Sequence, residues 1–103
     1  TNLRKGVVEF CVLAHLRNGR SYGFDLARTL ESDGLIASQG TVYPLLTRLR
    51  SAGLVDTEWV ESEAGRPRKY YALTEQGSTY LEAFEQVWGT VRRTVDETLR
   101  RPS

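Results

Sequence analysis

The sequence predicts a mainly α, α+β fold, a winged helix-turn-helix followed by one long C-terminal helix. Helical apolar patterns occupy three stretches of the first half of the chain. Two runs rich in β-branched and aromatic residues follow, separated by a loop that contains Gly65 and Pro67. A heptad-like apolar pattern occupies the last quarter. We therefore expect a winged helix-turn-helix domain over residues 1–73, with its wing at about 55–73, and a helical segment over residues 74–103.

The first helix is expected over residues 3–16, where only Glu9 and His15 interrupt the apolar run that starts at position 7. A helix that is apolar nearly all round is buried on more than one face. A domain of this size has one core, so the second face is predicted to meet another subunit. Val7 and Cys11 are the candidates for that contact, and Cys11 acts there as a small apolar residue.

A second helix is expected through Phe24 and Leu30, with Ser21 as its N-cap and Asp33-Gly34 at its end. The third helix lies within residues 38–53 and ends at Gly53. Its buried stripe consists of Val42, Leu45, Leu46, Leu49 and Ala52.

Because of Pro44, two residues are possible as the N-cap of the third helix. If Thr41 is the N-cap, Pro44 falls in the first turn, where a missing N–H costs nothing. If Ser38 is the N-cap, the helix is expected to bend locally.

The wing is expected to consist of two strands, at residues 54–61 and 68–74. Because side chains alternate along a strand, Lys69, Tyr71 and Leu73 point to one face of the second strand. The other face carries Arg68, Tyr70 and Ala72.

The last helix is expected to run from Thr74 to about Arg100, with Gly77 as its one weak point. It would span roughly 40 Å, which is longer than the rest of a small domain can cover. Its distal half therefore needs a partner, and we predict a homodimer. The apolar seam consists of Leu81, Phe84, Trp88, Val91, Val95 and Leu99.

The distribution of charge along the chain favours an anionic partner more strongly than the net charge does. The chain has 103 residues, a net charge of +1 and a pI of about 7.8, which is low for a nucleic-acid-binding domain. The wing loop nevertheless places Arg66, Arg68 and Lys69 together. Cations at an exposed hairpin tip can reach phosphates and release condensed counterions. The alternative is a solvated turn that balances the acidic residues of segment 56–63.

Several segments resemble PadR-type transcriptional regulators. They are YGFDLARTL (22–30), GTVYPLLTRLRSAGLV (40–55) and GRPRKYYALTEQG (65–77), followed by the apolar C-terminal helix. The resemblance covers about residues 19–77 and points to the small subfamily with a single C-terminal helix. It implies a dimeric winged-helix repressor of double-stranded DNA with a two-fold related operator. It also implies dimerisation through the first and last helices, and relief by a planar aromatic or phenolic effector near a Trp, for which Trp88 is the candidate.

The resemblance places the third helix in the major groove and the wing on the DNA backbone. The polar residues outside the apolar stripe of that helix can hydrogen-bond to bases or phosphates. Tyr22 would give its hydroxyl to a phosphate, and Arg4 and Lys5 would approach the backbone. The alternatives are a solvated helix face, Tyr43 packed on the second helix, a partly buried Tyr22 and solvated basic residues. The candidate residues on the third helix are Ser38, Gln39, Thr41, Tyr43, Thr47 and Arg48.

The sequence argues against an enzyme, a metal site and a cofactor. It contains no Gly-rich phosphate loop, one Cys and one His. No run of about 18 apolar residues is present, so no membrane span is expected. A single cysteine favours a reducing cytoplasm. Two rival functions remain: a winged-helix module that binds a protein and no DNA, and a ligand-binding dimer without a regulatory role.

Overall fold

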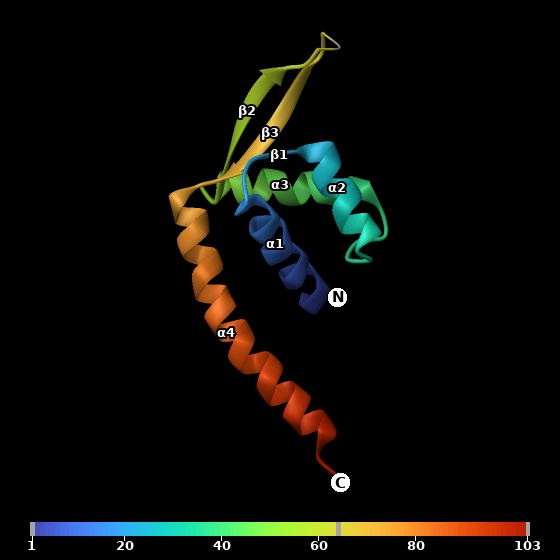
Figure 1. Cartoon of the computed structure of the whole chain (residues 1–103), viewed down its shortest axis with the longest axis vertical. Coiled ribbons are helices and arrows are strands. Elements are labelled where there is room, and N and C mark those ends of the chain that lie inside the picture. Colours follow the sequence, from blue (N-terminus) through green and yellow to red (C-terminus); the bar gives the residue numbers. More distant parts are fainter. Residues whose placement is uncertain (1, 64, 103) are drawn as a thin grey trace.

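The computed structural model describes residues 2–63 and 65–102, with side chains from Lys5 onward, and confirms the predicted mixed α+β architecture. Figure 1 shows a helical body, a wing that projects from it and a long last helix. In chain order the elements are α1 (Asn2–Leu16), β1 (Ser21–Tyr22), α2 (Gly23–Ser32), the 3₁₀ helix η1 (Gln39–Thr41), α3 (Val42–Ser51), β2 (Val55–Glu61), β3 (Pro67–Leu73) and α4 (Glu75–Arg100).

The wing belongs to a three-stranded antiparallel sheet of order β1-β3-β2. Within the hairpin, Val55 lies opposite Leu73. The short strand β1 pairs Ser21 with Tyr71, and this strand was not expected from the sequence. The prediction that Ser21 caps the second helix is wrong, because its backbone is part of the sheet. Tyr22 occupies the N-cap position instead and makes no side-chain capping bond.

Both candidate positions contribute to the start of the third helix. The Ser38 hydroxyl accepts a hydrogen bond from the Gly40 N–H and begins η1, which leads directly into α3. Thr41 is the backbone N-cap of α3 and makes no side-chain capping bond. Pro44 is then the third residue of α3, where the helix has no partner for a backbone N–H. Ala52 was predicted in the buried stripe but is exposed, because α3 ends at Ser51.

The core lies where α1 meets α2, α3 and the base of the wing. On α1, Val12 and Leu13 are fully buried, while Val7 and Cys11 on its other face are half-buried. The buried apolar residues of the described chain are Val8, Val12, Leu13, Leu16, Leu26, Ala27, Leu30, Val42, Leu46, Leu49, Leu54, Val55, Tyr71 and Leu81.

The first turn of α4 is fixed tightly to the base of the wing. Thr74, where the last helix was expected to begin, caps α4 by accepting a hydrogen bond from the Gly77 N–H at 2.9 Å. The same hydroxyl donates to the Gly53 carbonyl at 2.7 Å, and the Thr74 N–H donates to the Leu54 carbonyl. Gly77 is buried at this crossing.

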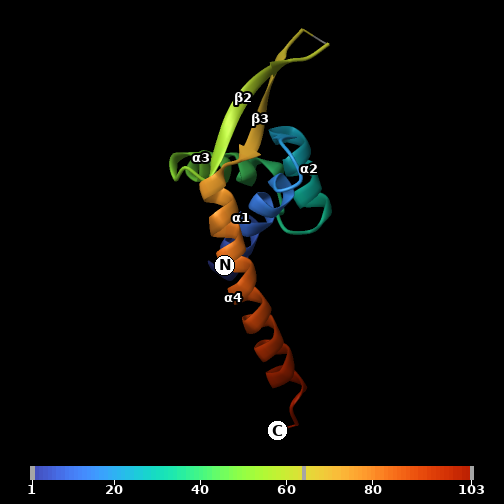
Figure 2. The same cartoon turned by 60° about the vertical axis from the view of Figure 1, so that its left-hand side comes forward.

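Only the first part of α4 packs on its own chain. Figure 2 shows that α4 runs beside α1 and then continues well beyond it. The molecule measures 61 × 29 × 21 Å, and the wing and the end of α4 form the two ends of the long axis. Within the described residues, we find no helix with the length and apolar character that crossing a membrane requires.

Candidate nucleic-acid interface

The hydroxyl groups at the start of the predicted recognition helix are engaged in local backbone bonds. The Thr41 hydroxyl donates to the Ser38 carbonyl at 2.8 Å, and the Ser38 hydroxyl accepts from the Gly40 N–H. Both residues are exposed at the turn that leads into α3. These bonds fix the shape of the turn. They leave the Ser38 hydroxyl hydrogen free to bind an acceptor.

Gln39 and Arg48 are held by acidic residues of neighbouring helices. The Gln39 amide donates to the Glu31 carboxylate of α2 at 2.9 Å. The Arg48 guanidinium donates to the Glu9 carboxylate of α1 at 3.0 Å. Each side chain would have to release or share this partner in order to contact a base. Neither bond could be predicted from the sequence, because each one joins residues of different helical elements, eight residues apart for Gln39 and 39 residues apart for Arg48.

Arg48 lies on the side of α3 that faces α1, and Lys5 lies across from it on α1. Together with Thr41 they line an open depression of about 420 Å³ with an aliphatic floor that includes Leu45 and Ile36. The side chain of Arg4 lies outside the described residues.

Tyr43 and Thr47 lie on the opposite side of α3, toward the wing. Thr47 lines a hollow of about 220 Å³ that it shares with Lys69 and Tyr71 of β3. Its hydroxyl donates back to the Tyr43 carbonyl at 3.1 Å. Arg50 lines the same hollow and was not among the predicted DNA-binding residues. Its position on the exposed face, next to the stripe, was a signal that could have identified it.

Of the wing cations, Arg66 and Arg68 are exposed and Lys69 is half-buried, and aromatic rings hold Arg68 and Lys69. The Arg68 guanidinium lies 4.9 Å from the centre of the Tyr22 ring. The Lys69 ammonium lies 5.9 Å from the Trp59 ring and 5.7 Å from the Tyr71 ring. Arg66 is exposed in the loop, which the Ser62 hydroxyl closes by donating to the Arg66 carbonyl at 2.7 Å.

The wing cations do not neutralise the acidic residues of β2. Across the hairpin, Trp59 lies opposite Lys69, and Val60 lies opposite Arg68. Over the described ranges, 2–63 and 65–102, the ion pairs join Arg17 to Glu85, Arg20 to Glu58, and Arg48 to Glu9, and the His15 imidazole lies 3.9 Å from the Asp33 carboxylate. The positive charge of the wing therefore remains available to an external anion.

Tyr22 is half-buried, so both predicted roles remain compatible with its position. Its ring packs near Phe24 and Tyr70, at centroid distances of 6.2 and 5.9 Å. The ring thus supports the junction of β1, β3 and α2. Arg68 covers it from the wing.

The predicted dimerisation residues differ in how far they are exposed. Leu81 is 3% exposed and belongs to the core of its own chain, which leaves little surface for a partner. Val91, Val95 and Leu99 are 45, 48 and 78% exposed along distal α4. Val7 and Cys11 are half-buried. Burial, and to a smaller extent Asp33, raises the pKa of the Cys11 thiol, so this side chain stays neutral.

A ladder of aromatic rings connects α1 to the exposed part of α4. Phe10 stacks on Phe84 at 3.6 Å and lies 5.2 Å from Tyr80. Phe84 stacks on Trp88 at 5.9 Å. Trp88 is 39% exposed at the end of this ladder.

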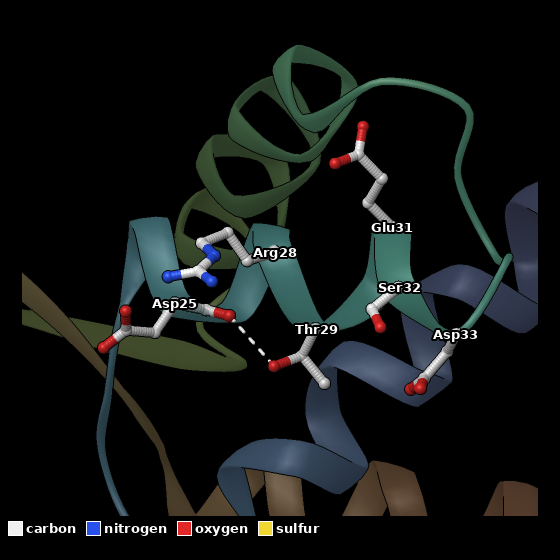
Figure 3. Close-up of a pocket in the computed structure, with 6 residues that line it drawn as sticks. All are labelled: Asp25, Arg28, Thr29, Glu31, Ser32 and Asp33. Carbon is white, nitrogen blue, oxygen red and sulfur yellow. Dashed lines mark hydrogen bonds between the residues drawn. The ribbon is translucent and has the colours of Figure 1, made fainter.

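A hollow on α2 is acidic and does not suit DNA. Figure 3 shows Asp25, Glu31 and Asp33 around it, with Arg28 and the Thr29 hydroxyl that donates to the Asp25 carbonyl. The three carboxylates point in different directions (Figure 3). No group of His, Cys, Asp and Glu side chains within the part of the chain that the structure covers is arranged to hold a metal ion.

Residues 12–83 match the model of the transcriptional regulator PadR-like family. A PadR-like transcriptional regulator from Bacillus cereus is 36% identical, and its structure superimposes with a TM-score of 0.89 over 99% of this chain and 100% of that one. A PadR-like transcription factor from Bacteroides fragilis is 41% identical, with a TM-score of 0.79 over 94% of each chain. The transcriptional regulator Rv3488 of Mycobacterium tuberculosis is 32% identical over 76% of this chain and 72% of its own length.

Proposed function

The chain belongs to the PadR-like family of transcriptional regulators, which bind DNA, usually dimerise and are not enzymes, and from this premise we propose that it is a homodimeric repressor. Two copies of α3 read the two halves of a two-fold related operator, and a small effector relieves repression. Residues 1–73 bind DNA, and residues 74–103 hold the dimer together.

One observation carries the DNA-binding part of the proposal. The exposed side of α3 and the face of β3 that carries Lys69 line a common hollow, through Thr47 and Lys69. A recognition helix and a wing that border the same opening can contact one DNA duplex at the same time. Phosphate contacts from the wing then set affinity and register, and the exposed side chains of α3 provide sequence discrimination.

The direct test is a titration of the protein into the DNA upstream of its own gene and into a shuffled fragment, at several salt concentrations. We expect tight binding to the first fragment, weak binding to the second, and a steep loss of affinity as salt rises. Equal weak binding to both fragments would contradict a local operator. Absent binding at all salt concentrations would instead support the protein-interaction module.

The exposed apolar side of distal α4 supports the homodimer. Burial of a Val or Leu side chain contributes about 1.5–3 kcal/mol, and several such residues lie exposed beyond Trp88. Val7 and Cys11 of α1 are half-buried, and α1 packs on α4 through the stack of Phe10 on Phe84, just before this surface begins.

We predict that the combined change Val95→Asp and Leu99→Asp converts the dimer to a monomer. Two carboxylates would remain desolvated in the interface, and each costs far more than the apolar contact contributes. Light scattering at micromolar concentration measures the mass. Arg100→Ala, at the exposed end of the same helix, is the control and should stay dimeric. A monomeric wild-type protein would refute the dimer itself.

The aromatic ladder supports Trp88 as a contact of a planar effector at the dimer interface. Planar rings stack on an aromatic face whose other side is already occupied by Phe84. Relief of repression follows if the effector binds better to a dimer in which the two α3 helices are wrongly spaced.

We predict that the planar dye proflavine quenches the fluorescence of Trp88. The measurement uses a Trp59→Phe background, because Trp59 is 66% exposed and would add its own emission. The response should disappear in Trp88→Ala while light scattering still reports a dimer. Quenching that persists in Trp88→Ala would exclude this site.

The proposed location is the cytoplasm, because a repressor must reach the chromosome. No cofactor is required for the proposed activity.

A further inference from the structure

We propose that the hollow between the end of α3 and the base of the wing is a binding site for a DNA backbone phosphate. We call it the phosphate notch and define it by its lining residues Thr47, Arg50, Ser51, Lys69 and Tyr71. The inference rests on the proposed DNA-binding function. It adds Arg50, Ser51 and Tyr71, to which neither the sequence nor the family assignment gave a role.

The notch lies between one side of α3 and one face of β3. Thr47, Arg50 and Ser51 are three and four residues apart on α3, so they lie on one side of the helix. Lys69 and Tyr71 are two residues apart on β3, so they lie on one face of the strand. The space between them measures about 220 Å³.

The chemistry of the lining is that of an anion site. Arg50 offers a planar guanidinium and Lys69 an ammonium group, while Ser51 and Tyr71 offer hydroxyl donors. Thr47 forms part of the wall, because its hydroxyl hydrogen is already donated to the Tyr43 carbonyl. Among the five lining residues there is no carboxylate. A phosphodiester, which carries one negative charge and only acceptor oxygens, matches this set of donors.

Tyr71 links the notch to the core. The residue is only 6% exposed, and its ring packs against the start of α2, close to Gly23. Burial, and then the neighbouring Tyr43, raise the pKa of its hydroxyl, which Arg50 partly opposes. The hydroxyl is therefore protonated at neutral pH and can donate a hydrogen bond. A donor fixed by the core pays little ordering entropy when an anion binds.

Lys69 is also held in place. Its ammonium group lies near the rings of Trp59 and Tyr71, from which it receives cation–π stabilisation. Trp59 is exposed beside it, so the emission of Trp59 can report occupation of the notch.

The position of the notch favours DNA over a free anion. It opens between the recognition helix and the wing, the two elements that approach the duplex together. A phosphate held there would fix the distance of the wing from α3 and would contribute to affinity without regard to base sequence.

Two variants test the proposal through different readouts. Arg50→Ala should weaken binding to both the upstream and the shuffled DNA fragment. It should also lower the slope of log affinity against log salt by about 0.9 for each notch in contact with DNA. Tyr71→Phe removes one donor and no charge. It should weaken binding roughly 10-fold with an unchanged salt slope. Tyr80→Phe in α4 and Arg101→Ala just after the end of α4 remove the same groups and should change neither quantity.

Thermal unfolding checks that Tyr71→Phe remains folded, and Ser51→Ala replaces it if it does not, because Ser51 is exposed. Wild-type binding by both notch variants would overturn the phosphate notch alone. Failure of the wild-type chain to bind either fragment would instead overturn the proposed function.

A second arm separates a DNA phosphate from a free anion. Inorganic phosphate is titrated against chloride at equal ionic strength, and the emission of Trp59 is followed in a Trp88→Phe background. Only a weak response, lost in Arg50→Ala, is expected if the site is built for DNA. A strong response to phosphate combined with unchanged DNA affinity in Arg50→Ala would overturn the DNA assignment in favour of a free anion.

Discussion

Replacement of Gly77 by alanine is expected to destabilise the chain by about 3 kcal/mol or more. A Cβ atom at this position would overlap the carbonyl oxygen of Leu54, and it would lie 2.8 Å from Cδ1 of Leu73. The Leu54 carbonyl accepts the Thr74 N–H and belongs to the rigid junction of α3, β2 and α4, so it cannot rotate away. Alanine gains only about 1 kcal/mol from its higher helix propensity, which the clash outweighs.

Thermal unfolding provides the measurement. A loss of about 3 kcal/mol corresponds to a fall in Tm of roughly 12 °C or more for a domain of this size. Gly89→Ala is the control on the same helix, because the nearest atom to its added Cβ is Nη1 of Arg93 at 3.8 Å. It should be neutral or slightly stabilising. Equal stability of the two variants would show that the contact between Gly77 and the Leu54 carbonyl is loose enough to admit a Cβ atom.

The double variant Arg66→Ala and Arg68→Ala is expected to reduce DNA affinity at least about 10-fold at moderate salt. Both side chains are exposed on the wing, and neither is engaged in an ion pair within the described residues. Loss of two phosphate contacts should lower the slope of log affinity against log salt by about 1.8 for each wing. The effect should be equal on the upstream and shuffled fragments, because phosphates carry no sequence information.

Arg100→Ala with Arg101→Ala is the matched control. It removes the same charge at the opposite end of the long axis (Figure 1). A purely non-specific attraction to net charge would affect both double variants alike. A wing variant that binds a protein partner less well, with DNA binding absent in the wild type, would identify the protein-interaction module.

The main elements of the fold could be predicted because each has a strong local signal. The apolar periodicity of α1 and α4, the Thr74 cap and the β-branched strands all lie within one stretch of chain. Strand β1 could not be predicted, because two residues carry no periodicity and Ser21 is a good cap by type. Gly77 appeared to be a weakness of the last helix, yet its missing side chain is what allows α4 to cross Leu54.

Side-chain contacts between different elements of the fold could not be predicted from the sequence, and they decide much of the site. Residue type favoured Gln39 and Arg48 for base contacts, whereas the fold ties each to an acid of another helix. Arg50 has the same side chain as Arg48 and was overlooked although it lies on the exposed face of α3, and Tyr71 was considered only as a strand residue. Their proximity depends on the angle at which β3 passes α3.

The crossing of α4 over the wing base also has a mechanical meaning. Beyond Leu81 the helix extends for roughly 28 Å, and this distal segment is almost entirely exposed within its own chain. A tilt of about 10° at the crossing would therefore move the last turn roughly 5 Å. The crossing sets the direction in which α4 leaves the domain, and the length of α4 multiplies any change in that direction. In a dimer joined through two such helices, small changes of packing at the crossing would set the separation of the two α3 helices. The spacing of a recognised operator could thus change while every DNA-contacting side chain stays the same.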